Sequence, residues 1–220
     1  MDNLIGKTLD GLYTIQELIG AGGMANVYKA VVSAPGGPVP EGTVVAVKVL
    51  RQELMHDADL VRRFKNESKA ISLLNHPNIV KVYDVSVSEN LQYIVMECVE
   101  GMTLREYLNE RGGKITSRET VHFIAQILRA LDHAHRNGVV HRDIKPHNVM
   151  VLKNGSVKVM DFGIARVMSK SNTLTKEALG SVHYISPEQA KGGHTDNRSD
   201  IYSLAAVSYT HLTLPTTSRV

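Results

Sequence analysis

Residues 139–163 constrain the fold more than any other part of the chain. Two short apolar runs are joined there across Asn154-Gly155, a dipeptide that suits the positive φ angles of a type I′ turn, so we expect a β-hairpin. Asp143 and Asn148 precede the first run, and Asp161 ends the second. A hairpin therefore returns Asp161 to the neighbourhood of the other two polar side chains.

Oxygen-bearing side chains gathered in this way suit one kind of chemistry. Carboxylate and amide oxygens are the ligands that Mg²⁺ takes in phosphate-binding sites, and a carboxylate can also accept the proton of a hydroxyl group. Each short motif alone occurs in ordinary turns. Their order along one chain points to a metal and nucleotide centre.

Short strands and one helix are predicted for the first hundred residues. Apolar runs at 12–20, 27–32, 44–50 and 93–99 indicate strands. Between them, Leu60, Phe64, Ile71 and Leu74 recur at helical spacing, and the helix should end before His76-Pro77. We place a boundary between two lobes near Gly101.

The first two strands flank a turn rich in glycine, residues 20–25. In a dinucleotide-binding fingerprint the glycines follow a strand and open a helix, whereas here a second strand follows. Without Cβ atoms, Gly20 and Gly22 allow backbone N–H groups to approach phosphate oxygens. A phosphate-covering loop is one interpretation, and a plain hairpin turn is the other.

Two charged residues fall on apolar faces. Strand alternation places Lys48 on the side of Ala46 and Leu50, and helical spacing places Glu67 in the stripe that contains Phe64. Burying either charge alone costs several kcal/mol, so we expect the two side chains to form an ion pair. The alternative is that each reaches water at the edge of its element.

The segment after Gly101 is predicted to be mainly helical. Thr116 and Glu119 match a capping box, the pattern that starts many helices. An apolar stripe follows, which we expect to face the core: Val121, Ile124, Ala125, Leu128 and Leu131. We interpret His133 and His135 as surface residues of this helix.

Composition excludes several other classes of protein. Of the 220 residues, 43% are hydrophobic and 21% are charged, as in ordinary globular proteins. The net charge of +3 comes with no basic run that would indicate a nucleic-acid partner. The single cysteine, Cys98, cannot form an intramolecular disulfide. No apolar stretch is long enough to span a membrane, so we expect no membrane contact by these residues.

Three segments together resemble a known family. IGAGGMANVYKA (19–30), HRDIKPHN (141–148) and GSVHYISPEQA (180–190) resemble eukaryotic-type protein kinases, most of all the bacterial membrane-anchored Ser/Thr kinases that sense the cell wall. The resemblance covers residues 11–206. It implies an α+β, bilobal protein-kinase fold: a small antiparallel β lobe with one helix at 11–98, and a mainly helical, incomplete large lobe at 99–206.

The resemblance also implies a role for individual residues. ATP would be bound by Ile19, Gly20, Ala21, Gly22, Val27, Ala46, Lys48, Met96, Glu97 and Val99. Lys48, held by Glu67, would contact the α- and β-phosphates. Asp143 would be the catalytic base and Lys145 would steady the γ-phosphate. Asn148 and Asp161 would bind Mg²⁺ or Mn²⁺.

The implied activity is ATP-dependent transfer of the γ-phosphate to Ser or Thr hydroxyls of protein substrates. Activation would follow autophosphorylation in trans, through self-association, at Thr173 or Thr175, with Arg142 receiving the new phosphate. We expect the chain to be cytoplasmic and its full-length parent to be membrane-anchored. The alternatives are a pseudokinase-type ATP-binding scaffold and a small-molecule phosphotransferase.

The carboxyl-terminal residues depart from the family. Residues 207–212 resemble the translation of an adapter used in sequencing libraries, so we expect 207–220 to be non-native and not helical. The alternative is a real, divergent tail. Without further helices, the apolar faces of 121–131 and 201–206 should lack partners, and Glu188 should lack the arginine that the family provides. We therefore expect this polypeptide to be unstable and weakly active.

Overall fold

The computed structural model describes residues 4–23, 25–88, 91–162 and 183–211, with the backbone alone at 58–60, 63 and 67. Contacts between Cα atoms divide these residues into two units. The first contains the residues up to Asn75 together with Val80–Val99, and the second contains His76–Ile79 and the residues from Glu100 onward. The assignment of His76–Ile79 to the second unit was not expected from the sequence. The predicted domain bounds stay predictions.

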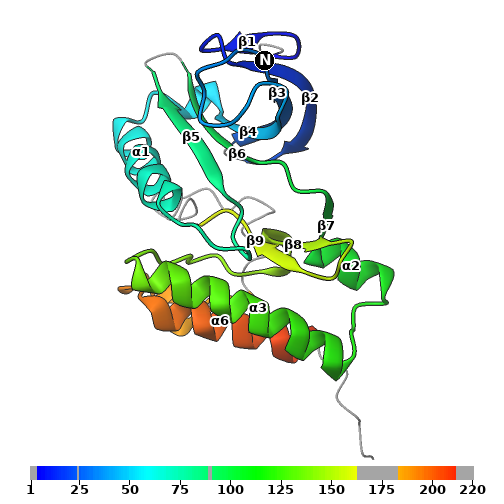
Figure 1. Cartoon of the computed structure of the whole chain (residues 1–220). Coiled ribbons are helices and arrows are strands. Elements are labelled where there is room, and N and C mark those ends of the chain that lie inside the picture. Colours follow the sequence, from blue (N-terminus) through cyan, green and yellow to red (C-terminus); the bar gives the residue numbers. More distant parts are fainter. Residues whose placement is uncertain (1–3, 24, 89–90, 163–182, 212–220) are drawn as a thin grey trace, which may run out of the picture. The chain divides into compact units, whose positions relative to one another are not determined.

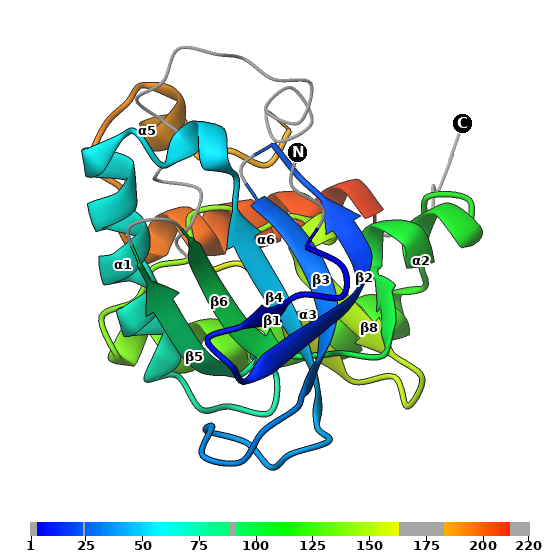
Figure 2. The ribbon, with the colours of Figure 1, turned by 90° about the horizontal axis from the view of Figure 1, so that it is seen from above.

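The first unit is built on a 6-stranded antiparallel sheet with the order β1-β2-β3-β4-β6-β5 (Figure 1; Figure 2). Its strands are β1 (Thr8–Leu9), β2 (Tyr13–Ala21), β3 (Ala25–Val32), β4 (Val44–Leu50), β5 (Val82–Val87) and β6 (Gln92–Glu97). The four predicted strands are confirmed as β2, β3, β4 and β6. Two strands were not predicted: β1 is only two residues long, and the apolar run of β5 is interrupted by Asp84 and Ser86.

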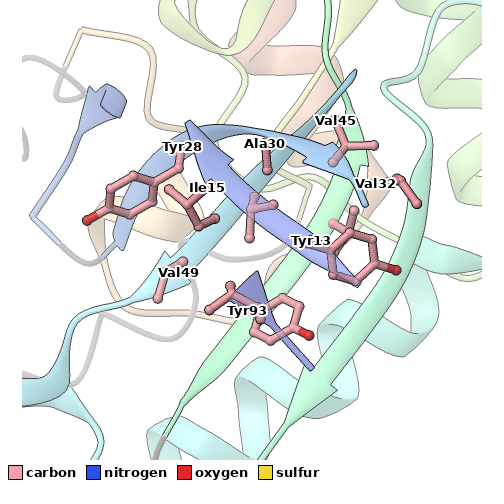
Figure 3. Packing of buried hydrophobic residues seen from close by; sticks show 11 residues of the cluster. Tyr13, Ile15, Tyr28, Ala30, Val32, Val45, Val49 and Tyr93 are labelled. Carbon is pink, nitrogen blue, oxygen red and sulfur yellow. The ribbon is translucent and has the colours of Figure 1, made fainter. Parts of the chain in front are cut away.

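One face of this sheet packs into the core of the first unit (Figure 3). Val45, Val47 and Val49 alternate along β4 and point to this side, where they meet Tyr13 and Tyr93. The two tyrosine rings contact edge to face, with centroids 6.2 Å apart. The odd-numbered residues of β4 therefore face this core, and the even-numbered residues face the opposite side, where Ala46, Lys48 and Leu50 are also buried.

A helix accompanies the sheet in the first unit. α1 (Ala58–Ser72) follows the short 3-10 helix η1 (Gln52–Leu54) and lies against β5. Phe64, Ile71 and Leu74 are buried, as the helical spacing predicts. The helix ends before His76-Pro77, which confirms the predicted boundary.

The second unit contains the predicted hairpin, with a different turn. β8 (Val149–Leu152) and β9 (Val157–Val159) pair antiparallel, and β7 (Gly101–Thr103) extends the sheet in the order β7-β8-β9. Of the turn dipeptide only Gly155 has a positive φ, of 80°, so the turn is not type I′. Gly155 N donates to Leu152 O at 2.9 Å, and Leu152 N donates to Ser156 O at 2.9 Å. The loop is wider because Asn154 Oδ1 accepts from the Ser156 N–H and hydroxyl.

Helices make up the rest of the described second unit. They are α2 (Leu104–Glu110), α3 (Ser117–Arg136), the 3-10 helix η2 (Pro146–Asn148), α5 (Pro187–Ala190) and α6 (Asn197–His211). α3 starts at the predicted capping box of Thr116 and Glu119, and α2 starts at a second such box, Thr103 and Glu106. α3 and α6 lie side by side (Figure 1). Across the described ranges, no helix combines the length and the apolar character needed to cross a bilayer.

The predicted inward face of α3 is only partly correct. Val121 is 68% exposed and Leu128 is 40% exposed, whereas Phe123, Ile127 and Ala130 are buried. Apolar residues cover more than one side of this helix, so periodicity alone does not identify the side that meets the hairpin and α6. Ile201 on α6 is 45% exposed, but Leu131 and Leu204 are buried and α3 packs against α6, so the two apolar faces are only partly without partners among the described residues.

The end of α6 contradicts the prediction that residues after 206 are not helical. The helix continues to His211, and Val207 is buried. Long-range hydrogen bonds hold this last turn: Ile115 N donates to His211 O at 3.1 Å, and His211 Nδ1 lies 3.0 Å from Gly113 O. These contacts offset the weak helix propensity of the local sequence. Whether 207–220 are native stays a prediction, and 212–220 lie outside the described residues.

The expectation for Glu188 is also wrong in one respect. Its carboxylate is partly exposed and accepts a hydrogen bond from the hydroxyl of Ser199, the buried residue before Asp200. This hydrogen bond holds the pKa of Glu188 below its ordinary value. A nearby hydroxyl thus provides the partner for which the sequence analysis found no arginine.

Acid should weaken the start of α3 through Glu119. Hydrogen bonds from Thr116 and then Tyr107 lower the pKa of Glu119 from 4.5 to about 2. A lowered pKa stabilises the fold above pH 4.5, and this contribution is lost as the pH falls towards 2. We expect Glu119→Gln to lower the free energy of unfolding by about 1 kcal/mol at pH 7.

The measurement is urea unfolding at several pH values, with Glu110→Gln, an exposed carboxylate at the end of α2, as the control. The difference between wild type and Glu119→Gln should shrink below pH 4.5. A difference that stayed constant down to pH 2 would show that the charge of Glu119 is not what stabilises the helix start.

Candidate active site

In the first unit, the pairing of neighbouring strands places several of the predicted nucleotide-contacting residues on one face of the sheet. Val27 is opposite both Gly20 and Lys48, and Ala46 is opposite Met96. Cross-strand partners share a face, and this face is the one turned away from the tyrosine core. Ala46 and Lys48 are both buried, with exposures of 6% and 9%. The register thus places an ammonium group on the same apolar surface as a small residue and Met96.

The glycine-rich turn closes one end of this face. Gly22 N donates to Ala25 O at 3.0 Å, and a Cβ on Gly22 would meet that same oxygen at 3.3 Å. Ile19 and Ala21 are exposed at the carboxyl-terminal end of β2. Neither Gly20 nor Gly22 has a positive φ, so close packing at the turn, rather than an unusual backbone angle, explains the glycine at position 22.

The structure says less about the other predicted site residues of the first unit, Glu97, Val99 and Glu67. Glu97 is opposite Val45 at the end of β6, so its side chain points away from the face that carries Met96, and Val99 follows in the connection. The side chain of Glu67 lies outside the described residues, so its ion pair with Lys48 stays a prediction.

The second unit places the predicted base in a defined hydrogen-bond network. Lys145 Nζ lies 2.7 Å from Asp143 Oδ2, and Asn148 Nδ2 donates to the same oxygen at 2.9 Å and to Asp143 O at 2.7 Å. The Asp143 carboxylate is partly exposed. With Oδ2 occupied in this way, Oδ1 is the oxygen that can accept a proton from an incoming hydroxyl group.

The hairpin brings the two predicted metal ligands together. Val149 is opposite Val159, and Met160 N donates to Asn148 O at 3.0 Å, so Asp161 follows directly beside Asn148. Asp161 has φ of 63°, a left-handed conformation that costs about 1–3 kcal/mol at a non-glycine residue. Strain of this kind is typical of residues whose position serves a function.

The donor set fits a magnesium ion that also binds phosphate. The Asn148 amide nitrogen is held by Asp143, which leaves Asn148 Oδ1 as the neutral oxygen that could bind a metal ion together with the Asp161 carboxylate. Mg²⁺ commonly takes one or two protein oxygens and completes its octahedron with water and substrate phosphates. No cluster of three His, Cys, Asp or Glu side chains suited to a metal occurs in the described ranges, so a cage made of protein alone is not present there.

A buried carboxylate anchors the loop that carries Asp143. Asp200 on α6 is fully buried and accepts hydrogen bonds from His141 N at 2.8 Å and Arg142 N at 2.7 Å. His135 Nε2 lies 2.7 Å from the same carboxylate, so the interpretation of His135 as a surface residue is wrong. Its partner is distant in sequence, and spacing gives no signal for such a contact.

Gln189 is a positioning residue that the sequence analysis missed. Its Nε2 donates to Arg142 O at 2.8 Å, and its Oε1 accepts from Ser186 N and Oγ. This arrangement links the start of α5 to a loop residue, Arg142, whose φ is 67°. The capping pattern of Ser186 and Gln189 was the available signal. The proposed phosphorylation sites Thr173 and Thr175 lie outside the described residues.

Comparisons with known proteins agree with this arrangement of sheet, hairpin and loop. The model of the protein kinase domain family matches residues 13–218, and the chain belongs to this family. Members of the family use ATP and a divalent cation. The expected bilobal α+β protein-kinase fold is confirmed.

Curated relatives are bacterial Ser/Thr kinases. The chain is 47% identical over 211 residues to serine/threonine-protein kinase PrkC of Bacillus subtilis, covering 96% of this chain and 32% of that protein. It is 45% identical over 210 residues to the probable kinase PknB of Lactococcus lactis, covering 95% and 32%. The chain thus spans about a third of the length of these relatives.

Comparison with solved structures also finds a kinase domain. The kinase domain of PknI from Mycobacterium tuberculosis is similar with a TM-score of 0.73 and 29% sequence identity, over 92% of this chain and 74% of that one.

Proposed function

We propose that this chain is the catalytic part of an ATP-dependent protein serine/threonine kinase. The observation that carries the proposal is the loop around Asp143, where Lys145 and Asn148 contact the Asp143 carboxylate and the hairpin brings Asp161 beside Asn148. A pseudokinase has normally lost Lys48, Asp143 or Asp161, and all three residues are present.

Each side chain has a defined task in the proposed transfer. Lys48 would contact the α- and β-phosphates of ATP, and Gly20, Gly22 and Val27 would cover the nucleotide. Asn148 and Asp161 would hold Mg²⁺ or Mn²⁺, which neutralises charge on the phosphate oxygens when bound. Asp143 Oδ1 would orient the Ser or Thr hydroxyl and take its proton as the oxygen bonds to the γ-phosphorus and ADP leaves. Lys145 would steady the γ-phosphate.

The finer parts of the proposal concern the surroundings of the reaction. We propose protein substrates, activation by autophosphorylation between two copies at Thr173 or Thr175, and a parent protein anchored in a membrane with its kinase part in the cytoplasm. Similarity to PrkC and PknB supports the general class. Mass spectrometry after incubation with ATP should find phosphate between residues 163 and 182.

The test is transfer of phosphate from labelled ATP to a generic protein, with and without a chelator. We expect labelling of Ser and Thr that is lost when the divalent cation is removed. ATP binding without any transfer would favour the scaffold, and labelling of a small-molecule acceptor but no protein would favour the phosphotransferase. Either result would overturn the proposed function.

A further inference from the structure

A buried amide on α3 has no task in the proposed transfer. Gln126 is 8% exposed and lies on the side of α3 that packs against β9 (Figure 1). Its Oε1 accepts hydrogen bonds from Asn78 Nδ2 and from Val157 N, both at 3.0 Å. Asn78 belongs to the second unit, although it lies between α1 and β5 in the sequence, and Val157 begins β9. One side-chain oxygen therefore joins three segments that are distant in sequence.

The two donors fix the orientation of the Gln126 amide. Both are N–H groups, so the atom that they meet must be the oxygen. Nε2 then faces the preceding turn of α3, where it donates to His122 O at 3.3 Å and lies 3.0 Å from His122 Nε2. The reversed amide would place its NH₂ group against two other donors, which is costly in a buried place. Gln126 is thus held with its oxygen towards β9.

The strand β9 uses its two edges differently. Ser156 O and Met160 N, at its two ends, bond towards β8. Since the backbone groups of successive residues alternate between the edges of a strand, those of Val157 and Val159 point to the opposite edge. Both valines are fully buried, and a buried N–H or C=O group needs a partner. Another segment of the chain must therefore satisfy this second edge.

Asn78 and Gln126 take the place of a neighbouring strand at that edge. Asn78 Nδ2 donates to Val157 O at 2.8 Å, and Val159 N donates to Asn78 O at 2.8 Å. Ile79 forms a parallel bridge with Val159, and Gln126 Oε1 accepts from Val157 N. Asn78 is 8% exposed, so these hydrogen bonds are shielded from water. Val157 N depends on Gln126 for its partner in this junction.

The hold on β9 extends to Asp161, which lies two residues beyond Val159. Asp161 has φ of 63°, and a loosened chain would relax from this strained conformation. Mg²⁺ demands near-ideal geometry from its oxygen ligands, so a small shift of the Asp161 carboxylate costs affinity. Replacing a residue that supports a metal ligand from behind typically lowers metal affinity about 10- to 100-fold.

We propose that Gln126 is a positioning residue for the metal site. Through Val157 it fixes the end of β9, and the end of β9 fixes Asp161, so Gln126 sets the affinity for a divalent cation without touching the cation. The proposal rests on the proposed function, in which Asp161 binds the cation that accompanies ATP. The task of Gln126 differs from that of Asp200, which holds the loop of Asp143.

Two replacements of Gln126 separate its oxygen from its size. Gln126→Met keeps the length of the side chain, removes the acceptor and leaves Val157 N without its partner. Gln126→Glu keeps an oxygen for both donors, and His122 Nε2 can donate to the second oxygen because it lies 3.0 Å from Gln126 Nε2. Thr120→Val is the matched control, since Thr120 is a buried residue of α3 whose hydroxyl donates to Thr116 O at 2.9 Å.

Hydrogen exchange without nucleotide tests the hold on β9. We expect the backbone N–H groups of residues 157–160 to exchange about tenfold faster in Gln126→Met than in wild type, because a hydrogen bond that protects them is lost. Gln126→Glu and Thr120→Val should exchange at the wild-type rate there. Asn78→Ser removes the other side chain of the junction, should act like Gln126→Met, and replaces that variant if it does not fold.

Electron paramagnetic resonance of free Mn²⁺ gives the Kd of the cation in the presence of a non-hydrolysable ATP analogue. We expect about tenfold weaker binding of Mn²⁺ in Gln126→Met, and wild-type binding in Gln126→Glu and Thr120→Val. In transfer assays, the Mg²⁺ concentration for the half-maximal rate should rise by the same factor, while KM for a peptide substrate stays unchanged. A role in stability alone would lower the melting temperature and leave both metal constants unchanged.

The outcomes separate the two proposals. Wild-type exchange at 157–160 in Gln126→Met, or faster exchange with an unchanged Kd for Mn²⁺, would overturn the positioning role. An equal loss of Mn²⁺ affinity in Gln126→Glu would also overturn it, because the acceptor oxygen would then not matter. Faster exchange in Gln126→Met, together with no binding of Mn²⁺ and the ATP analogue by wild type, would support the hold on β9 and contradict the proposed function.

Discussion

Asp143→Asn should reduce phosphate transfer by about a thousandfold, because general-base assistance contributes roughly a hundredfold to ten-thousandfold in rate. Asparagine keeps an oxygen that can accept the hydrogen bond from Asn148 Nδ2, which Asp143 now accepts at 2.9 Å. It lacks the charge that pairs with Lys145 and the basicity that takes a hydroxyl proton. The loss should therefore appear in kcat rather than in the Kd for ATP.

The measurement is the rate of labelled phosphate transfer to a serine peptide at saturating ATP, together with a separate titration of ATP binding. Asp132→Asn is the matched control, since Asp132 is an exposed α3 carboxylate in an ion pair with Arg136. The control should transfer at the wild-type rate. If Asp143→Asn retained more than about a tenth of the rate, Asp143 would not be the base.

Asp200→Ala should lower the free energy of unfolding by about 3–5 kcal/mol. The change deprives His141 N, Arg142 N and His135 of the carboxylate that they contact in a fully buried place. A buried donor without a partner costs about 1–3 kcal/mol, and two backbone donors are affected. The loop would also lose a restraint on Arg142, whose left-handed conformation needs support.

Urea unfolding of wild type and Asp200→Ala measures this effect, with Asp132→Ala as a surface control whose midpoint should stay unchanged. Asp200→Asn should fall between wild type and Asp200→Ala, because the amide oxygen can still accept one of the hydrogen bonds. A decrease of less than about 1 kcal/mol for Asp200→Ala would mean that water replaces the carboxylate and that α6 does not anchor the loop.

Local sequence patterns predicted the parts of the fold that local interactions determine. Alternation along 44–50, the capping box at Thr116 and the two runs around Asn154-Gly155 all correspond to elements at those places. The resemblance to protein kinases added the identity of the family, which the comparison with the family model confirms.

Contacts between distant segments could not be predicted in the same way. His135 reaches Asp200, and the last turn of α6 is held by Gly113 and Ile115, because the folded chain brings these groups together. The side of α3 that becomes buried likewise depends on which elements pack against it. The prediction of a type I′ turn was wrong because the Asn154 side chain accepts a hydrogen bond from the backbone N–H of Ser156.

Isothermal titration calorimetry of the full chain with ATP tests the central claim most directly, namely that the chain binds ATP together with a divalent cation. We predict measurable binding of ATP with Mg²⁺, loss of most of that affinity with a chelator, and a matching loss in Asp161→Asn and Lys48→Ala, while Asp132→Asn binds like wild type. ATP binding of equal strength with and without Mg²⁺, unchanged in Asp161→Asn, would contradict it.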